Sequence, residues 1–140
     1  MDEFAIIQKF FNQNPIQRND VKLGIGDDCA ITQVPEHHDL ISTVDTLAAD
    51  VHFFADSPAD LIGYRSLAVN LSDIAAMGAV PCWFLLALTL PEADAVWLKS
   101  FSQGLFECAK AFGVQLIGGN LAKGPLNINI TVLGTVPRNQ

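Results

Sequence analysis

An apolar run, AVPCWFLLALTL from Ala79 to Leu90, constrains the fold of this chain more than any other feature. It contains a proline and falls well short of the roughly 20 apolar residues that a membrane-spanning helix needs. It also lacks the regular polar positions of a strand with one wet face, so we expect a strand covered on both faces. A helix would cover one face and a second subunit the other, which predicts that the chain oligomerises.

Residue patterns on either side of this run predict two long helices. Ser57, Pro58 and Asp60 are typical of a helix start, and the first helix is expected to run to Met77. The second helix is expected between residues 91 and 113, with Gly113 closing it. The apolar positions of the first helix are Leu61, Leu67, Ala68, Leu71, Ile74 and Ala75. Those of the second are Val96, Leu98, Phe101, Leu105 and Ala109.

The remaining patterned segments predict strands and a short opening helix. We expect a short amphipathic helix over 4–11, then strands at 21–33 (broken at its glycines), 40–47, 81–90, 114–119 and 126–136. The last strand alternates apolar residues with Asn127, Asn129 and Thr131, so one of its faces should be wet. This order predicts an α/β fold of the α+β layer type, with a mixed sheet and both long helices on one face.

Composition indicates a single domain and narrows its partners. Half of the 140 residues are hydrophobic, and fifteen acids face eight bases for a net charge of −7, which disfavours nucleic acid and anionic membranes. Cys29, Cys82 and Cys108 have no CxxC spacing, so we expect buried thiols in a cytoplasmic protein. The chain starts without the basic region of a secretory signal and ends directly after a strand, so we expect the first part of a longer protein.

Four acids interrupt segments that are expected to be buried. They are Asp27 and Asp28 in the stretch GIGDDCA, Asp45 in ISTVDTL, and Asp73 on the first long helix. Buried carboxylates are costly unless they are paired or bind a metal, and oxygen ligands indicate Mg²⁺ or Mn²⁺ rather than zinc. Two alternatives stay open, because the Asp27–Asp28 pair is also typical of a turn and Asp73 is also placed to pair with Arg65.

Two glycine-containing stretches and one histidine are further candidates for a binding site. GIGDDC lacks the third glycine of a dinucleotide fingerprint, and GGNLAKG lacks the spacing of a P-loop. A Gly-Gly pair at the end of a strand still lets a phosphate approach the backbone N–H groups. His52 is either a core histidine or, if the acidic site exists, a contact to a ligand.

Several segments together resemble a known family. LGIGDDCA, ISTVDTL followed by VHFF, AVNLSDIAAMGAVPCWFLLALTLP, and LIGGN with KGPLNINITVLGTVP occur in the order and spacing of the N-terminal domain of the bacterial thiamine-monophosphate kinase family. More broadly, the chain is similar to the aminoimidazole-ribonucleotide-synthetase-like superfamily of ATP-using enzymes. The resemblance implies that residues 1–140 are an N-terminal domain that forms a homodimer and binds ATP with several Mg²⁺ ions near the dimer interface.

The resemblance also implies roles for particular residues. It makes Asp28, Asp45 and Asp73 magnesium ligands, with Thr43 and the backbone around Val44 in the same metal and phosphate shell. Gly119 and Asn120 correspond to the nucleotide and metal site, and His52 to a contact with thiamine monophosphate. The implied reaction moves the γ-phosphoryl group of ATP onto thiamine monophosphate. The attacking group is already an anionic phosphate oxygen, so no catalytic base is expected.

Some positions depart from the family pattern. Asn120 stands where an aspartate is usual, Leu121 and Ala122 replace threonines, Val44 stands where a threonine is common, and Asp50 where glycine is common. These changes remove or alter oxygen atoms near the expected metals, so we predict weaker Mg²⁺ binding than is usual in the family. The family's C-terminal domain is absent from residues 1–140, so this piece alone is not expected to turn over. There are two alternatives to a thiamine-monophosphate kinase. One is another enzyme of the superfamily, and the other is a module that only dimerises.

Overall fold

A four-stranded mixed sheet forms the centre of the molecule, in a computed structural model that describes residues 2–52 and 56–139. Its strands are β3 (His38–Ala48), β4 (Val80–Leu90), β5 (Gln115–Lys123) and β6 (Asn127–Pro137), in the order β3-β6-β4-β5. The β4 and β5 strands are parallel, whereas β6 is antiparallel to both β3 and β4. The predicted mixed sheet is therefore confirmed.

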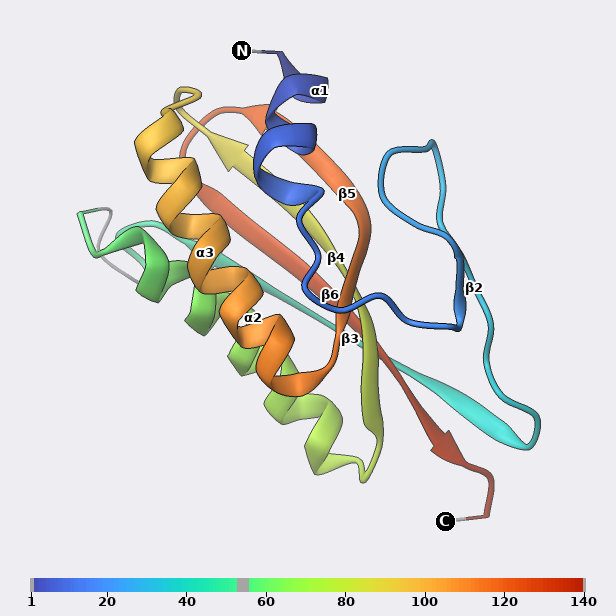
Figure 1. Cartoon of the computed structure of the whole chain (residues 1–140). Helices are drawn as coiled ribbons and strands as arrows, with labels where there is room; N and C mark the ends of the chain where they lie inside the picture. Colours follow the sequence, from blue (N-terminus) through green and yellow to red (C-terminus); the bar gives the residue numbers. More distant parts are fainter. Residues whose placement is uncertain (1, 53–55, 140) are drawn as a thin grey trace.

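Two long helices, α2 (Ala59–Ala76) and α3 (Ala95–Phe112), lie side by side on one face of this sheet (Figure 1). The α3 helix starts after Asp94, whose carboxylate accepts hydrogen bonds from the backbone N–H groups of Val96 and Trp97. The α2 helix starts after Pro58 with no side-chain cap, so Ser57, which the sequence offered as part of the helix start, does not cap it. Both helices otherwise have the predicted bounds to within a few residues.

Close contact between α2 and α3 depends on two glycines. A methyl group at Gly63 would collide with the backbone carbonyl of Phe101, and one at Gly104 with the backbone carbonyl of Asp60. The buried faces of both helices differ in part from the predicted ones. Leu61 and Val96 were expected to face the sheet but are exposed, and the buried face of α2 includes Ile62, Ser66 and Asn70 instead.

The main hydrophobic core lies between the helices and the sheet. The sheet contributes alternate residues of β4 and β6, and the helices contribute their inward-facing side chains. Members that are at most 5% exposed include Phe84, Leu86, Leu88, Ile128, Ile130, Val132, Leu67, Ile74, Leu98, Phe101 and Leu105. The predicted apolar alternation of the last strand is confirmed in Leu126, which packs against the core, and in Ile128, Ile130 and Val132.

The N-terminal fifth of the chain differs most from the prediction. The opening helix is present as α1 (Glu3–Ile6), continued by the π-helix η1 (Ile7–Phe11). Residues 21–33 do not form one broken strand: β1 (Val21–Leu23) and β2 (Ile31–Thr32) form a separate antiparallel sheet with a loop between them. We call residues 12–19 the strap and residues 20–33 the arm.

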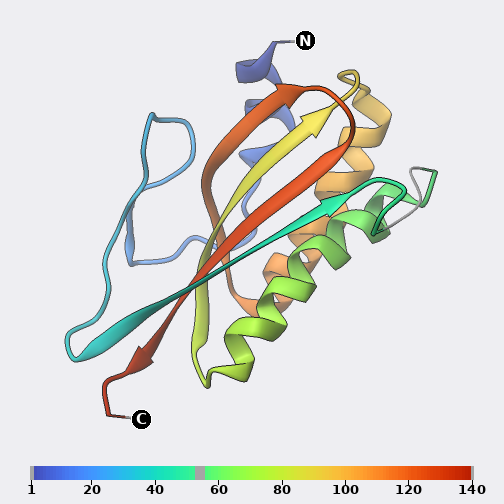
Figure 2. The ribbon, with the colours of Figure 1, turned by 180° about the vertical axis from the view of Figure 1, so that it is seen from behind.

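The arm covers part of the sheet face opposite the helices, as the view from behind shows (Figure 2). Val21, Ala30 and nearby Val34 pack there against a second buried cluster of Cys82, Trp83 and Ile117. The chain covers one end of this face with its own arm, and the expected cover by a second subunit stays a prediction. Elsewhere on this face Leu40 and Val44 are exposed.

The cysteines and the helices bear on two further expectations from the sequence. Cys82 and Cys108 are buried as predicted, but Cys29 is exposed, because it lies in the loop of the arm rather than in a strand. Within residues 2–52 and 56–139, no helix combines the length and the apolar character needed to cross a membrane.

Candidate functional site

A cleft of about 320 Å³ opens where the loop of the arm meets β5. One wall consists of residues 27–30 from the arm, and the other of residues 117–120 from β5. Its floor is the open face of the sheet, with Ala87 from β4 and Asn129 and Thr131 from β6. The structure thus brings together Asp28, Gly119 and Asn120, which are about 90 positions apart in the sequence.

The arm wall of the cleft presents two adjacent carboxylates. Asp27 and Asp28 are both exposed, and Asp27 Oδ1 accepts a hydrogen bond from the backbone N–H of Asp28 at 2.9 Å. This bond is a turn interaction, so the turn alternative for the pair has a basis in the structure. It also engages the Asp27 carboxylate with the loop itself, which makes Asp28 the better placed of the two for a ligand.

The β5 wall depends on a glycine that no other residue could replace. Gly119 has φ 151°, and a methyl group there would collide with the backbone carbonyl of Leu86 in β4. The β4–β5 register shifts just before this point, between Phe84 and Leu85. The bulge lets β5 continue and leaves Asn120 exposed at the cleft, opposite Ala87.

Two polar residues on the floor of the cleft were not singled out as site residues. Asn129 donates a hydrogen bond from Nδ2 to Thr46 Oγ1 at 2.7 Å, so its carbonyl oxygen is the atom that can ligate a cation. Thr131 adds a hydroxyl oxygen to the same floor. The polar alternation of the last strand was the signal that could have found both residues.

Thr43, Val44 and Asp45 lie at the other edge of the sheet, on β3. Thr43 and Asp45 pair with Val132 and Ile130 and share their face of the sheet, toward the helices. Val44 lies on the open face, opposite Thr131. Asn120, Ala87, Asn129 and Thr46 form one row across the sheet, so Asn120 and the neighbourhood of Asp45 are about 14 Å apart, three strand spacings.

Asp73 lies in a third place, on the last turn of α2. It is exposed, and α2 runs away from the end of β3 that carries Asp45 (Figure 1). The alternative pairing with Arg65 does not occur: the ion pairs among the described residues join Arg18 to Asp20 and Arg138 to Asp39. A metal was predicted at Asp73 because the residue was expected to be buried, and in this single chain it is exposed.

His52 lies in the turn that follows β3. Its ring Nδ1 accepts a hydrogen bond from the backbone N–H of Ala48 at 3.0 Å. The backbone N–H of His52 donates to the carbonyl oxygen of Ala48. The ring is exposed rather than in the core, and the neutral form therefore carries its proton on the outward Nε2. The phenylalanines of the VHFF segment, Phe53 and Phe54, lie outside the described residues.

The oxygen donors of the cleft fit a hard cation, but one chain does not gather the whole predicted set. Asp28, Asn120, Asn129 and Thr131 offer carboxylate, amide and hydroxyl oxygens, the ligand types that Mg²⁺ prefers. Among residues 2–52 and 56–139, no group of three or more histidine, cysteine, aspartate or glutamate side chains is arranged to hold a metal ion. The predicted ligands instead occupy the cleft, the β3 edge and the end of α2.

This fold and cleft correspond to a known family. The AIR synthase related protein family, N-terminal domain, matches residues 26–136, a span that starts in the loop of the arm and ends in β6. The chain belongs to this family, and it corresponds to the N-terminal domain. Both walls of the cleft lie within the matched span, as does every residue to which the sequence assigned a role.

Relatives within this family are thiamine-monophosphate kinases. The kinase of Escherichia coli K12 is 51% identical over 136 residues, which cover 96% of this chain and 42% of the relative. A crystal structure of the kinase from Stenotrophomonas maltophilia K279a is 45% identical, with a TM-score of 0.88 over 100% of this chain and 44% of that one. The chain therefore spans less than half the length of these relatives, and the resemblance stated from the sequence is confirmed.

A second solved relative carries ligands. It is AaThiL complexed with AMPPCP and TMP, which is 30% identical, with a TM-score of 0.71 over 81% of this chain and 37% of that one. Its fold and that of the Stenotrophomonas kinase confirm the predicted fold class of a mixed sheet with helices.

Proposed function

We propose that this chain is the N-terminal domain of a thiamine-monophosphate kinase, which transfers the γ-phosphoryl group of ATP to thiamine monophosphate. The observation that carries the proposal is the cleft, where the Asp27–Asp28 loop faces Gly119 and Asn120 in a chain 51% identical to the Escherichia coli kinase. The relative bound to AMPPCP and TMP supports the two substrates. A cytoplasmic location belongs to the proposal, since free cysteines suit a reducing compartment.

The proposed reaction requires the two substrates to be aligned and does not require a catalytic base. A phosphate oxygen of thiamine monophosphate attacks the γ-phosphorus, the bond from that phosphorus to the bridging oxygen of ADP breaks, and thiamine diphosphate and ADP leave. Both reactants are anions that repel each other, so the protein has to hold them in line and offset their charge. The backbone at Gly119 allows a close phosphate approach, and His52 would donate from Nε2 to the phosphate of thiamine monophosphate.

Magnesium ions would supply the positive charge that this acidic chain lacks. We place them on Asp28 and Asn120 at the cleft, and on Asp45, Asp73, Thr43 and the backbone of Val44. Bound Mg²⁺ neutralises charge on the transferring phosphoryl group. Because Asn120 contributes an oxygen without a charge, the cleft should bind Mg²⁺ more weakly than one with an aspartate there.

The role of Asn120 is tested by Asn120→Asp. We expect about tenfold tighter Mg²⁺ binding, because the change adds one carboxylate at the cleft. Titration calorimetry with Mg²⁺ and AMPPCP measures it, and Asn127→Asp, on the same sheet but outside the lining of the cleft, is the matched control. An unchanged Mg²⁺ affinity in Asn120→Asp would defeat this assignment.

A homodimer would bring the cleft of one copy close to Val44 of the other, whereas the side chains of Thr43 and Asp45 face the helices. One chain holds Asp28 and Asn120 at the β5 edge and Asp45 at the β3 edge, about 14 Å away across the sheet. Leu40 and Val44, at 49% and 56% exposure, leave an apolar area on the open face along β3, the strand at one of these edges. In a two-fold dimer that pairs these faces, the β5 edge of one copy would lie against the β3 edge of the other.

The dimer is tested by sedimentation of Val44→Asp. We expect a dimer for the unmodified chain and a monomer for the variant, because the substitution places a charge in the apolar contact. Val69→Asp on the outer side of α2, where Val69 is also partly exposed, should remain a dimer. A monomeric unmodified chain would contradict the proposal.

Two other functions remain alternatives. Another ATP-dependent enzyme of the family would share the fold and the cleft but not respond to thiamine monophosphate. A module that only dimerises would sediment as a dimer without binding Mg²⁺ or AMPPCP. A protein that carries this chain with the full length of its relatives should release ADP only when thiamine monophosphate is present, and an equal rate without it overturns the kinase proposal.

A further inference from the structure

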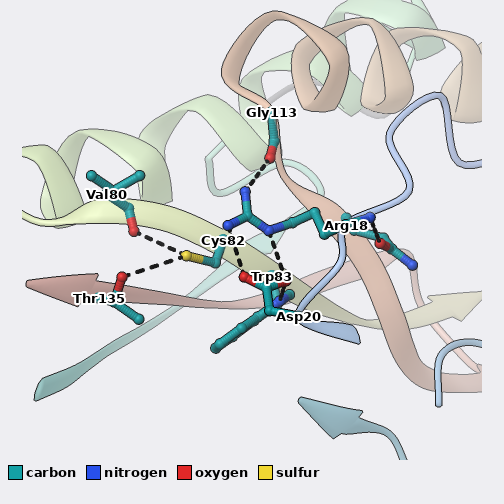
Figure 3. Close-up of polar contacts among 8 residues, drawn as sticks. Arg18, Asp20, Val80, Cys82, Trp83, Gly113 and Thr135 are labelled. Atoms are coloured by element: carbon teal, nitrogen blue, oxygen red, sulfur yellow. Dashed lines mark hydrogen bonds and ion pairs between the residues drawn. The ribbon is translucent and has the colours of Figure 1, made fainter. Parts of the chain in front are cut away.

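The arm that carries Asp27 and Asp28 is attached to the centre of the sheet through Asp20 (Figure 3). Asp20 Oδ1 accepts hydrogen bonds from Trp83 Nε1 at 2.9 Å and from Arg18 Nε at 3.0 Å. Its Oδ2 accepts from Arg18 Nη2 at 2.9 Å. Trp83 is a fully buried residue of β4, so the carboxylate connects the start of the arm to a buried residue of the sheet.

Arg18 is held in turn by the segment between α3 and β5. Its Nη1 donates to the carbonyl of Gly113 at 2.9 Å, and its backbone N–H donates to Gln115 Oε1 at 2.7 Å (Figure 3). Asn14, earlier in the strap, exchanges two hydrogen bonds with the backbone of Leu116, at 2.9 and 3.0 Å. The guanidinium of Arg18 therefore has a fixed orientation toward Asp20 that does not depend on the arm.

Both ends of the arm meet at Asp20. The backbone N–H of Gln33, where the arm ends, donates to the carbonyl oxygen of Asp20 at 2.8 Å. Between these ends Leu23 and Ile31 are exposed, and the apolar contacts of the arm come from Val21 and Ala30 to the second cluster and from Ile25 to the main core. These apolar contacts are few, and the polar anchor at Asp20 adds a directional attachment at the point where the arm starts and ends.

Electrostatics keep this anchor ionised. Burial alone would raise the pKa of Asp20, but the hydrogen bonds from Arg18 and Trp83 and the charge of Arg18 outweigh it, so the pKa lies below its ordinary value. The ion pair of Arg138 with Asp39 offers a contrast: it joins the same residue types at 3.2 Å, but both side chains are about 60% exposed and lie outside the arm.

We propose that Arg18, Asp20 and Trp83 form a clamp that positions the Asp27–Asp28 loop against Gly119 and Asn120, and so makes Arg18 and Asp20 positioning residues for cation binding in the cleft. The cation part rests on the proposed function. The effect of the clamp on the loop does not require a metal, so the two parts can be tested separately.

Loop position is tested with a nitroxide on Cys29, an exposed cysteine in the loop, while Cys82 and Cys108 are buried. Electron paramagnetic resonance spectra should show an ordered label in the unmodified chain and a mobile one in Asp20→Ala. Trp83→Phe removes one hydrogen bond and keeps an aromatic ring in the core, so we expect an intermediate spectrum. Asp39→Ala removes the exposed ion pair and should leave the spectrum unchanged.

Cation binding is tested with Mn²⁺ on the unlabelled proteins, at a temperature where circular dichroism shows every variant folded. We expect Mn²⁺ affinity to fall about tenfold in Asp20→Ala and about threefold in Trp83→Phe. A cation that binds only when the loop lies against β5 loses affinity in proportion to the fraction of molecules with the loop in that position. Asp39→Ala should change the affinity by less than about twofold.

The outcomes separate the two ideas. A folded Asp20→Ala with an ordered label and unchanged Mn²⁺ affinity overturns the clamp, and if that variant does not fold, the same result in Trp83→Phe overturns it. An unmodified chain that binds no Mn²⁺ contradicts the proposed function, and the label on Cys29 then decides the clamp by itself.

Discussion

The two faces of the sheet are built from alternate residues of the same strands, yet their environments are opposite. Toward the helices, Leu88, Ile128 and Ile130 are each 1% exposed. On the other face, Thr131 and Asn129 line the cleft, and Val44 is 56% exposed. Burial against α2 and α3 stabilises the first face, whereas the arm covers one end of the second face, which carries the proposed binding features. Stability and proposed function are therefore divided between neighbouring residues of one strand.

Ile130 and Thr131 provide the most direct test of this division. Ile130→Ala should lower the free energy of unfolding by about 4 kcal/mol, because it removes a fully buried side chain and leaves a cavity. Thr131→Ala, one residue further on the open face, should lower it by less than about 1 kcal/mol. Urea unfolding measures both, and similar losses would show that the open face contributes to stability as much as the covered one.

Asp20 tests whether the arm side contributes stability through charge. At pH 7, Asp20→Asn should lower the free energy of unfolding by about 2 kcal/mol, since it weakens hydrogen bonds to a charged group. The pKa of Asp20 is lowered in the folded state, so its contribution is fully present above the unfolded pKa of about 3.9 and is lost as pH falls through the folded pKa.

The two proteins should therefore converge in stability below about pH 4. Thermal unfolding between pH 7 and pH 2 measures the difference. Trp83→Phe keeps the ion pair with Arg18, so it should retain most of the pH dependence. A constant difference between the unmodified chain and Asp20→Asn down to pH 2 contradicts this account.

Thiol reactivity is the mildest test of the contrast between the faces. Cys29 lines the cleft and should react readily with a disulfide reagent at pH 8, whereas Cys108 lies on the buried side of α3, in the core. Burial, with a smaller effect of the Glu107 charge, raises the pKa of Cys108 to about 11, so little thiolate exists even where the reagent can reach it. A fast reaction of Cys108 in the native chain would show that the covered face opens, whereas Cys82 is buried in the cluster under the arm.

Regular elements were predictable where their signals are local. The bounds of α2 and α3, the strands of the main sheet and the alternation of β6 followed from periodicity and from residues such as Asp94 and Gly113. The errors concern burial, which depends on residues distant in the sequence. Val96 is apolar and at a helical position that was expected to be buried, but it is exposed, and Asp73 lies on the solvent side of α2. The arm was misread because its short strands pair only with each other.

By itself, the sequence determined the class of fold, the family resemblance and the residue types of the cleft, because periodicity, capping residues and short motifs are carried by neighbours along the chain. Only the tertiary structure decided which of these residues meet. The strand order β3-β6-β4-β5 separates Asp45 from Asn120, while the arm brings Asp28 to Asn120 across about 90 positions. Contacts of this kind depend on which faces are buried together and on long-range hydrogen bonds such as that between Asp20 and Trp83. The local residue pattern does not specify either of these.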